Sequence, residues 1–441
     1  MIQLWPSSSG LGVLLFVITL ILPASARAEP GAAAAAVVAQ QLPLLNEILQ
    51  QGTIDSAAVG ALIDQLVDLR SLTTRTFGSY TRRSLQEYEK PLSDSEFRRL
   101  IARNEARLVS LFRSRVVTDL MTLMRSTGLS RFELGDPFAK MESSREASLK
   151  LRGHTAGDET IVVELILERE RKHWKVVDLT YDHLAFSQRY EDEFSDVLKN
   201  DYSLAVLAAR LAREDFISLE DFASSQEGTL PAEWYWRDRD KDNPKLFEVH
   251  KGANYQYLAA QDTGLSVILL KIAHWNPQEF PILTWCWRAN ALPPGGDERI
   301  TETNDSAAGL YVIFHENWFG LPIQIKYVWS TTLPVGTIGR RDMIARPYFF
   351  VEQSGDESLG QWEFEQVDLV ADYDRVFDEI PKNRTLGIGV LTDSNNTHTY
   401  AEADYADFRV WPRQALESGS MPDHCACLPD ATDPGMQHGQ N

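Results

Sequence analysis

The chain has 441 residues and carries 63 Asp and Glu against 43 Lys and Arg, a formal net charge of −20. Its length predicts two domains, because one hydrophobic core rarely serves so long a chain. The charge excludes nucleic acid as a partner, since that binding depends on Lys and Arg neutralising phosphates. It also disfavours adsorption to an anionic membrane surface, so a lipid ligand would be held inside the protein.

The N-terminus predicts export. Residues 11–22 form an apolar run too short to span a bilayer, and Ala26 and Ala28 supply the small residues of a signal peptidase site. We therefore predict a signal peptide over 1–28 and a periplasmic location. The alternative is an uncleaved membrane anchor, because no Lys or Arg precedes the apolar run. The Ala-rich residues 29–41 are expected to form a linker.

Residues 42–213 predict an α+β domain. Apolar residues recur with a helical period from 42 to about 127, Ser93 with Glu96 three residues later predicts a helix start, and Gly128 would end the run. The expected elements that follow are strands over 147–152, 160–168 and 174–180, then a helix over 186–199. Alternation in 160–168 predicts a curved antiparallel sheet, covered by helices, whose inner face could border a cavity.

The period changes in the second half of the chain. A helical pattern continues through 201–223, and residues 214–229 are expected to connect the two domains. The strands expected beyond this connector are 255–260, 265–273, 282–288, 307–314, 323–330, 348–353, 362–370, 384–391 and 403–411. Short strands separated by Pro, Gly, Asn and Asp turns predict an all-β sandwich or jelly roll over 230–412. The tail 413–441 has little apolar content and is expected to be disordered.

Three cysteines exclude a disulfide scaffold. Cys286 lies between Trp285 and Trp287 and is expected to be a small core or sheet-face residue. Cys425 and Cys427 lie beside His424 in the polar tail, where a disulfide between them or no bond at all is expected. A metal site is disfavoured, because a structural zinc needs about four ligands.

The first half resembles the MlaC (toluene-tolerance) family. The residues that carry the resemblance are Phe-Gly-Ser-Tyr-Thr-Arg-Arg at 77–83, the charged helix after Ser93, and Trp-Lys-Val-Val-Asp at 174–178. The resemblance covers about 42–213 and departs from the family at 182–184 and 190–191. It implies a periplasmic protein that binds phospholipid and passes it between the membrane complexes of an ABC-type lipid transport system.

The second half resembles an uncharacterised bacterial family catalogued as domain of unknown function 3047. The residues that carry this resemblance are those at 283–288, 304–312, 325–329, 371–373 and 391–397. The family often has two aspartates where this chain has Asn304 and Asp305. The resemblance covers about 230–412 and implies a β-rich exported domain without an established activity.

Apolar residues of the first half are candidates for a lipid pocket. They are Phe77, Tyr80, Leu108, Phe112, Val116, Leu120, Ile161, Val163, Leu165, Leu167, Trp174 and Val176. Pattern alone favours an ordinary core for these residues. With the family resemblance added, a core and a lipid pocket are about equally favoured.

The second half offers weaker candidates. Trp285 and Trp287 share one face of their strand, so either both are buried or both form a platform on which sugar rings stack. Asp393 and Asn395 carry oxygen atoms of the kind that Ca²⁺ prefers, but the same residues are typical of a plain turn. No catalytic or nucleotide-binding motif is present, so we expect no enzyme and no cofactor.

We therefore expect a periplasmic phospholipid carrier with an appended β-sandwich that binds a partner or an envelope glycan. The alternative is a carbohydrate-binding or glycan-acting envelope protein in which the first half is a spacer. A third possibility is a module that only mediates protein interactions. The sequence leaves the ligand of the β domain open.

Overall fold

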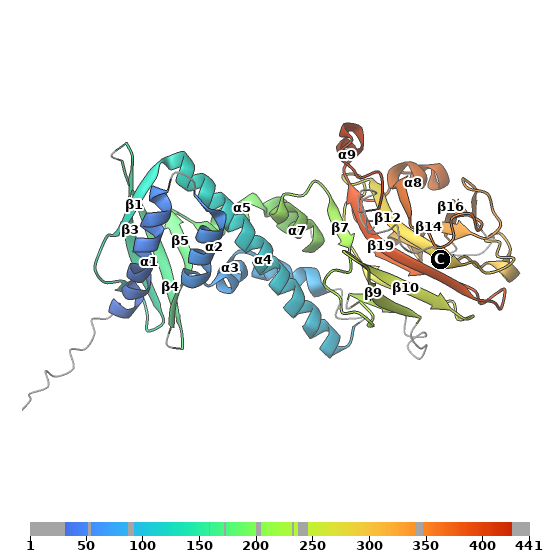
Figure 1. Cartoon of the computed structure of the whole chain (residues 1–441), viewed down its shortest axis with the longest axis horizontal. Coiled ribbons are helices and arrows are strands. Elements are labelled where there is room, and N and C mark those ends of the chain that lie inside the picture. The colour runs from blue at the N-terminus through green and yellow to red at the C-terminus, as the bar shows by residue number, and fades with distance from the viewer. Residues whose placement is uncertain are drawn as a thin grey trace, which may run out of the picture. The chain divides into compact units, whose positions relative to one another are not determined.

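The structure is a computed structural model of the whole chain (Figure 1). It describes residues 31–51, 54–86, 92–157, 159–171, 173–199, 204–231, 233–236, 246–340 and 347–425. The predicted signal peptide over 1–28 lies outside these residues. The contacts divide the chain into two compact units, residues 1–68 with 124–183 and residues 69–123 with 184–441. The α+β domain expected over 42–213 is therefore shared between the two units, because helix α4 (Asp94–Thr127) contributes to both.

The first unit is an antiparallel sheet with two helices. Its elements are α1 (Ala32–Gln50), α2 (Ser56–Leu66), β1 (Leu129–Leu134), β2 (Lys140–Met141), β3 (Glu146–Thr155), β4 (Thr160–Glu170) and β5 (His173–Tyr181). The strand order is β1-β3-β4-β5, with β2 paired to β3. Leu165 and Leu167 on β4 are buried, which confirms the alternation that predicted this strand.

The Ala-rich stretch belongs to this core, so the linker expected over 29–41 is wrong. Gly31, with a φ of 94°, precedes α1, and Ala34, Ala35 and Val38 pack in one cluster with Leu165. Alanine has the highest helix propensity, and its small side chain lets a helix approach a sheet closely. By length and composition alone, α1 is the one helix of the described residues that could cross a membrane.

The second unit begins with helices. They are α3 (Leu69–Leu85), residues 94–123 of α4, α5 (Phe186–Glu193), α6 (Ser195–Lys199) and α7 (Leu204–Ala212), and the short strand β6 (Leu184–Ala185) precedes α5. The predicted helix start is confirmed, because the Ser93 amide donates to Glu96 at 2.9 Å while the Glu96 amide donates to Ser93 Oγ at 3.4 Å.

Two packed sheets form the rest of the second unit, which confirms a β-sandwich. One sheet has the order β17-β12-β19-β10-β9, with β7 also paired to β19, and the other has the order β15-β16-β14-β13-β18-β11-β8. The strands of the first sheet are β7 (Ile217–Glu220), β9 (Phe247–Lys251), β10 (Gln256–Asp262), β12 (Ile282–Ala291), β17 (Glu363–Asp368) and β19 (Ala401–Trp411). Those of the second are β8 (Trp234–Trp236), β11 (Leu269–Ile272), β13 (Ala308–Glu316), β14 (Pro322–Ser330), β15 (Ile338–Arg340), β16 (Tyr348–Ser354) and β18 (Gly387–Leu391).

Several boundaries differ from the expectation. The connector expected over 214–229 contains β7, which pairs with the end of β19 and so belongs to the sandwich. The strand expected over 362–370 ends at Asp368, whose side chain accepts from the amides of Val370 and Ala371 and starts helix α8 (Leu369–Phe377). A short 3-10 helix, η3 (Thr301–Thr303), precedes β13.

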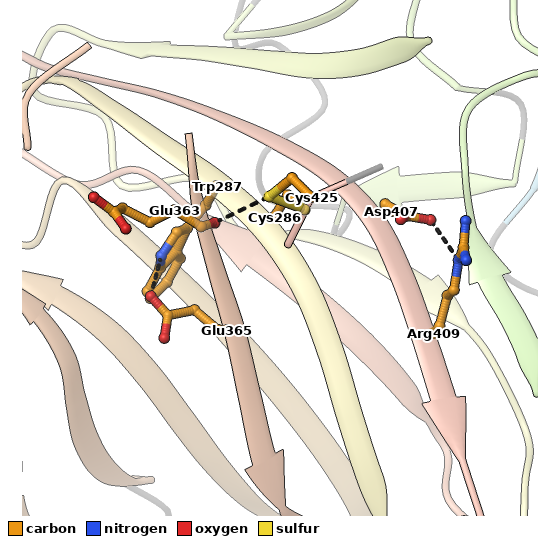
Figure 2. Close-up of a disulfide and its surroundings, with 7 residues drawn as sticks. All are labelled: Cys286, Trp287, Glu363, Glu365, Asp407, Arg409 and Cys425. Atoms are coloured by element: carbon orange, nitrogen blue, oxygen red, sulfur yellow. Dashed lines mark hydrogen bonds and ion pairs between the residues drawn. A yellow bond between two sulfur atoms is a disulfide. The ribbon is translucent and has the colours of Figure 1, made fainter. Parts of the chain in front are cut away.

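The C-terminal tail is ordered further than expected. Helix α9 (Arg413–Ser418) follows β19, and Cys425 forms a disulfide with Cys286 of β12 (Figure 2). The disordered tail expected over 413–441 is therefore wrong up to Cys425, as is the expectation that Cys425 pairs with Cys427 or forms no bond. The two cysteines are far apart in sequence, and only the fold brings their Cα atoms to 5.8 Å. Cys427 lies outside the described residues.

Candidate functional site

The sheet residues predicted to line a lipid cavity are packed in the first unit. Leu165, Leu167, Trp174 and Val176 are buried in the cluster that includes α1, and Val163 packs against it. Ile161 lies over Gly153, where a Cβ atom would come within 2.8 Å of the Ile161 Cγ1. Five of these six residues therefore form a core with α1, whereas Ile161 is half-buried outside that cluster.

The helix residues of the same prediction belong to the second unit. Phe77 and Phe112 meet at 5.2 Å between ring centroids, and Tyr190 lies 4.8 Å from Phe112 in an edge-to-face contact. Tyr80 and Val116 are also buried, and Leu120 is half-buried. Because the two sets lie in different units, a cavity shared between them stays a prediction.

A pocket of about 430 Å³ lies between α3 and α4. Its lining residues are Arg70, Thr73, Thr74, Gly78, Thr81, Leu85, Phe97, Ile101, Glu105, Leu108 and Val109. Leu108 is the residue shared with the predicted lipid pocket. Thr74 and Arg70 are exposed, so the pocket opens to solvent. Its volume lies in the range of pockets that hold small ligands, roughly 300–1,000 Å³.

One charged pair lies at this pocket. Arg70 Nη2 is 2.9 Å from Glu105 Oε2, and the Arg70 side chain is 72% exposed. An exposed ion pair exchanges partners readily, because water screens its attraction. A guanidinium at the mouth of an apolar pocket can bind a phosphate or carboxylate head group.

A buried ion network lies on the other side of α4. Lys271 Nζ is 2.7 Å from Glu220 Oε2 and 3.1 Å from Glu233 Oε2, and Arg103 of α4 lies 2.7 Å from Glu233 Oε1. Although burial opposes it, the attraction of Lys271 and Arg103 lowers the pKa of Glu233 to about 2. The network ties α4 to β7, to β11 and to the residue before β8, so it holds one wall of the pocket in place.

Trp285 and Trp287 do not form a surface platform. Both are fully buried, with ring centroids 5.3 Å apart, and they pack on Tyr327 and Trp329 of the opposite sheet. Of the two alternatives predicted for these residues, the structure shows the one in which both are buried. A glycan could not stack on rings that face the other sheet.

Asp393 and Asn395, the candidate metal ligands, lie in a loop held by buried polar groups. Asp393 is 2% exposed and burial raises its pKa to about 6, while the Lys326 ammonium opposes the rise. Asp305 accepts from the Asn396 amide at 3.2 Å and from the Thr397 amide at 2.6 Å. Among the residues that the structure describes, no group of three or more His, Cys, Asp or Glu could hold a metal ion. The arrangement anchors the loop.

The sequence did not single out one group of carboxylates. Burial, together with Glu365 and Asp372, raises the pKa of Glu352 to about 7, and burial raises that of Glu365 to about 7. Glu365 Oε1 accepts from Trp287 Nε1 at 2.9 Å (Figure 2). It also accepts from Gln353 Nε2 at 3.0 Å. Glu352 and Asp372 line a pocket of about 260 Å³. Paired acids with raised pKa values can donate and accept protons near neutral pH. Acidic residues occur throughout the chain, so no sequence signal distinguished these.

Comparisons with known proteins describe the two halves separately. Residues 233–409 match a family described as "Protein of unknown function (DUF3047)", which confirms the resemblance predicted for the second half. No curated protein matches the chain. A solved structure of a phospholipid-binding protein from Ralstonia solanacearum, in complex with a phospholipid, is 15% identical, with a TM-score of 0.32 over 41% of this chain and 95% of that one.

Other solved structures match with lower scores. A family 30 carbohydrate-binding module is 10% identical, with a TM-score of 0.23 over 38% of this chain and 83% of that one. A family 12 xyloglucanase from Bacillus licheniformis is 10% identical, with a TM-score of 0.24 over 45% of this chain and 92% of that one.

Proposed function

We propose that this protein binds a phospholipid by placing an acyl chain in the pocket between α3 and α4. The observation that carries the proposal is the pocket itself, about 430 Å³ lined by Leu85, Phe97, Ile101, Leu108 and Val109. Each methylene removed from water contributes about 0.8 kcal/mol, so a chain held there along its length would bind tightly. Release would then require a partner that opens the pocket.

The polar edge of the pocket fits the other end of such a ligand. Arg70 lines the pocket and is largely exposed, so its guanidinium can exchange Glu105 for a phosphate. A phospholipid would then place its chain among apolar side chains and its phosphate at Arg70. An uncharged lipid would gain only the first of these contacts.

A role in lipid transport follows from the sequence resemblance of 77–83 and 174–178 to the MlaC family. We propose an exported, periplasmic carrier that passes phospholipid between membrane complexes of an ABC-type transport system. The protein has no enzymatic activity in this proposal. We expect a membrane permease complex to co-purify with the full chain. Removing the bound lipid should not release that complex.

Lipid analysis tests the binding step. The purified full chain is incubated with phosphatidylglycerol and phosphatidylethanolamine vesicles, re-isolated, and its lipid content is measured by mass spectrometry. We expect Thr74→Trp and Val109→Trp, which fill the pocket from its two walls, to lower the bound lipid about tenfold. Ser110→Trp places the same ring at an exposed position of α4 outside the pocket lining and should load like the wild type.

Two results would overturn the proposal. One is that no phospholipid co-purifies or loads from vesicles. The other is that both filled variants load as much lipid as the wild type while circular dichroism shows that they are folded. Arg70→Gln adds a check on the head group, because it should weaken loading of phosphatidylglycerol more than that of diacylglycerol.

A further inference from the structure

A separate pocket of about 450 Å³ opens on the β-sandwich, between β19, the hairpin that joins β9 to β10, and the loop after β7. Its lining combines one aromatic ring, small apolar residues and several polar side chains. Neither the predicted lipid residues nor Trp285 and Trp287 line this pocket. The pocket is therefore separate from both predicted sites.

A strained residue places a carboxylate in this pocket. Asp407 of β19 has a φ of 57°, at a bulge where the pairing with β12 shifts register between Thr284 and Cys286. Its Oδ1 accepts from Arg409 Nε at 2.6 Å (Figure 2). In a strand without a bulge, residues 407 and 409 would lie on one face and Ala406 on the other. The bulge therefore lets Ala406 line the same pocket as Asp407 and Arg409.

An aromatic ring forms another wall. Tyr255 is half-buried and folds over Gly252, where a Cβ atom would come within 2.5 Å of the ring. Trp362 and Tyr257 support it, at 6.0 and 5.9 Å between ring centroids. Because Gly252 has no side chain, the tyrosine ring can lie against its backbone. These contacts place the ring at the wall of the pocket.

The polar groups offer both donors and acceptors. Gln256 Nε2 donates to the Ala223 carbonyl at 3.4 Å, while Gln256 Oε1 is buried and has no hydrogen-bond partner among the described residues. Lys251 and Arg409 add positive charges, and Asp221 and Asp407 add negative ones, so the lining is balanced. An anionic ligand would need an excess of positive charge, and a wholly apolar ligand would leave these groups unpaired.

We propose that this pocket binds a neutral saccharide. Hydroxyl groups both donate and accept, so a sugar can pair with Asp407, Arg409 and Gln256 at once. The apolar face of a sugar ring can pack on the Tyr255 ring. This site is distinct from the α3–α4 pocket and does not depend on lipid binding.

Calorimetric titration of the full chain tests the proposal. The probes are four neutral tetrasaccharides, built from glucose, mannose, galactose and N-acetylglucosamine, with tetragalacturonate as the acidic comparison. At least one neutral probe should bind. Tyr255→Ala should weaken that binding about tenfold or more, and Gln256→Ala should weaken it several-fold. Tyr255→Phe keeps the ring and should bind within about threefold of the wild type.

Tyr400→Ala is the matched control, since Tyr400 is an exposed tyrosine that precedes β19 outside this pocket. It should bind like the wild type. The proposal is overturned if no neutral probe binds, if tetragalacturonate binds more tightly than all of them, or if Gln256→Ala and Tyr255→Ala bind as the wild type does. If Tyr255→Ala fails to fold, Gln256→Ala alone decides. Lipid loading should be unchanged in the Tyr255 variants.

Discussion

Cys286, in the middle of β12, is joined by a disulfide to Cys425, which lies 139 residues further along the chain (Figure 2). The bond closes a loop that contains β13 to β19 and helix α9, and both sulfur atoms are buried. A long closed loop restricts the unfolded chain, which stabilises the folded state. Disulfides persist in oxidising compartments, in agreement with the predicted export.

Cys425→Ser should lower the free energy of unfolding of the β-sandwich by about 2–4 kcal/mol. Urea denaturation followed by tryptophan fluorescence measures it, and dithiothreitol should reproduce the effect in the wild type. Cys427→Ser is the control and should leave stability unchanged. Peptide mapping under non-reducing conditions that found Cys425 joined to Cys427 would contradict the assignment.

Lys271→Met should lower the free energy of unfolding by about 3–5 kcal/mol, because it leaves Glu220 and Glu233 without their shared countercharge. Chemical denaturation measures the change. Arg70→Gln breaks an exposed pair and should cost less than about 1 kcal/mol. Equal losses in the two variants would show that burial of the network does not set its strength.

Glu365→Gln should make stability less dependent on pH. The pKa of Glu365 is raised from 4.5 to about 7 in the folded protein. The protonated carboxyl group therefore stabilises the folded state fully below pH 4.5, and this stabilisation is lost as the pH rises through 7. Glutamine keeps the acceptor oxygen for Trp287 and Gln353 but cannot ionise.

At pH 8 the variant should therefore be more stable than the wild type by about 1–3 kcal/mol, with a smaller difference at pH 5. Thermal and urea unfolding across this range measure it. Glu357→Gln, at an exposed position, removes one charge without touching this cluster and is the control. A constant difference between variant and wild type from pH 5 to 8 would be inconsistent with the assignment.

Asp305→Ala should destabilise the loop that contains Asp393 and Asn395. Asp305 is fully buried and accepts from two backbone amides and the Thr397 hydroxyl, so its removal leaves buried donors unpaired. We expect a loss of at least about 3 kcal/mol and faster hydrogen exchange at residues 393–397. Asp356→Ala at an exposed position should stay within about 0.5 kcal/mol of the wild type. Unchanged exchange in Asp305→Ala would contradict the anchoring role.

Short-range patterns predicted much of the fold. Alternation over 160–168 predicted β4, and Ser93 with Glu96 predicted the start of α4, because both signals depend on neighbours within a few residues. The Ala-rich residues of α1 predict a linker from sequence, because alanine carries no periodic signal of its own. Their burial depends on the sheet that they contact.

By itself, the sequence determined the two fold classes, the change of period near 224–228 and the resemblance of the second half to a family of unknown function. Tertiary structure decided which face each residue presents: Trp285 and Trp287 turn inward, while Tyr255 and Asp407 reach a pocket. It also decided that Cys286 pairs with Cys425 and that Glu352 lies near Glu365. Local periodicity depends on neighbours in the chain, whereas these relationships join residues that only packing brings together.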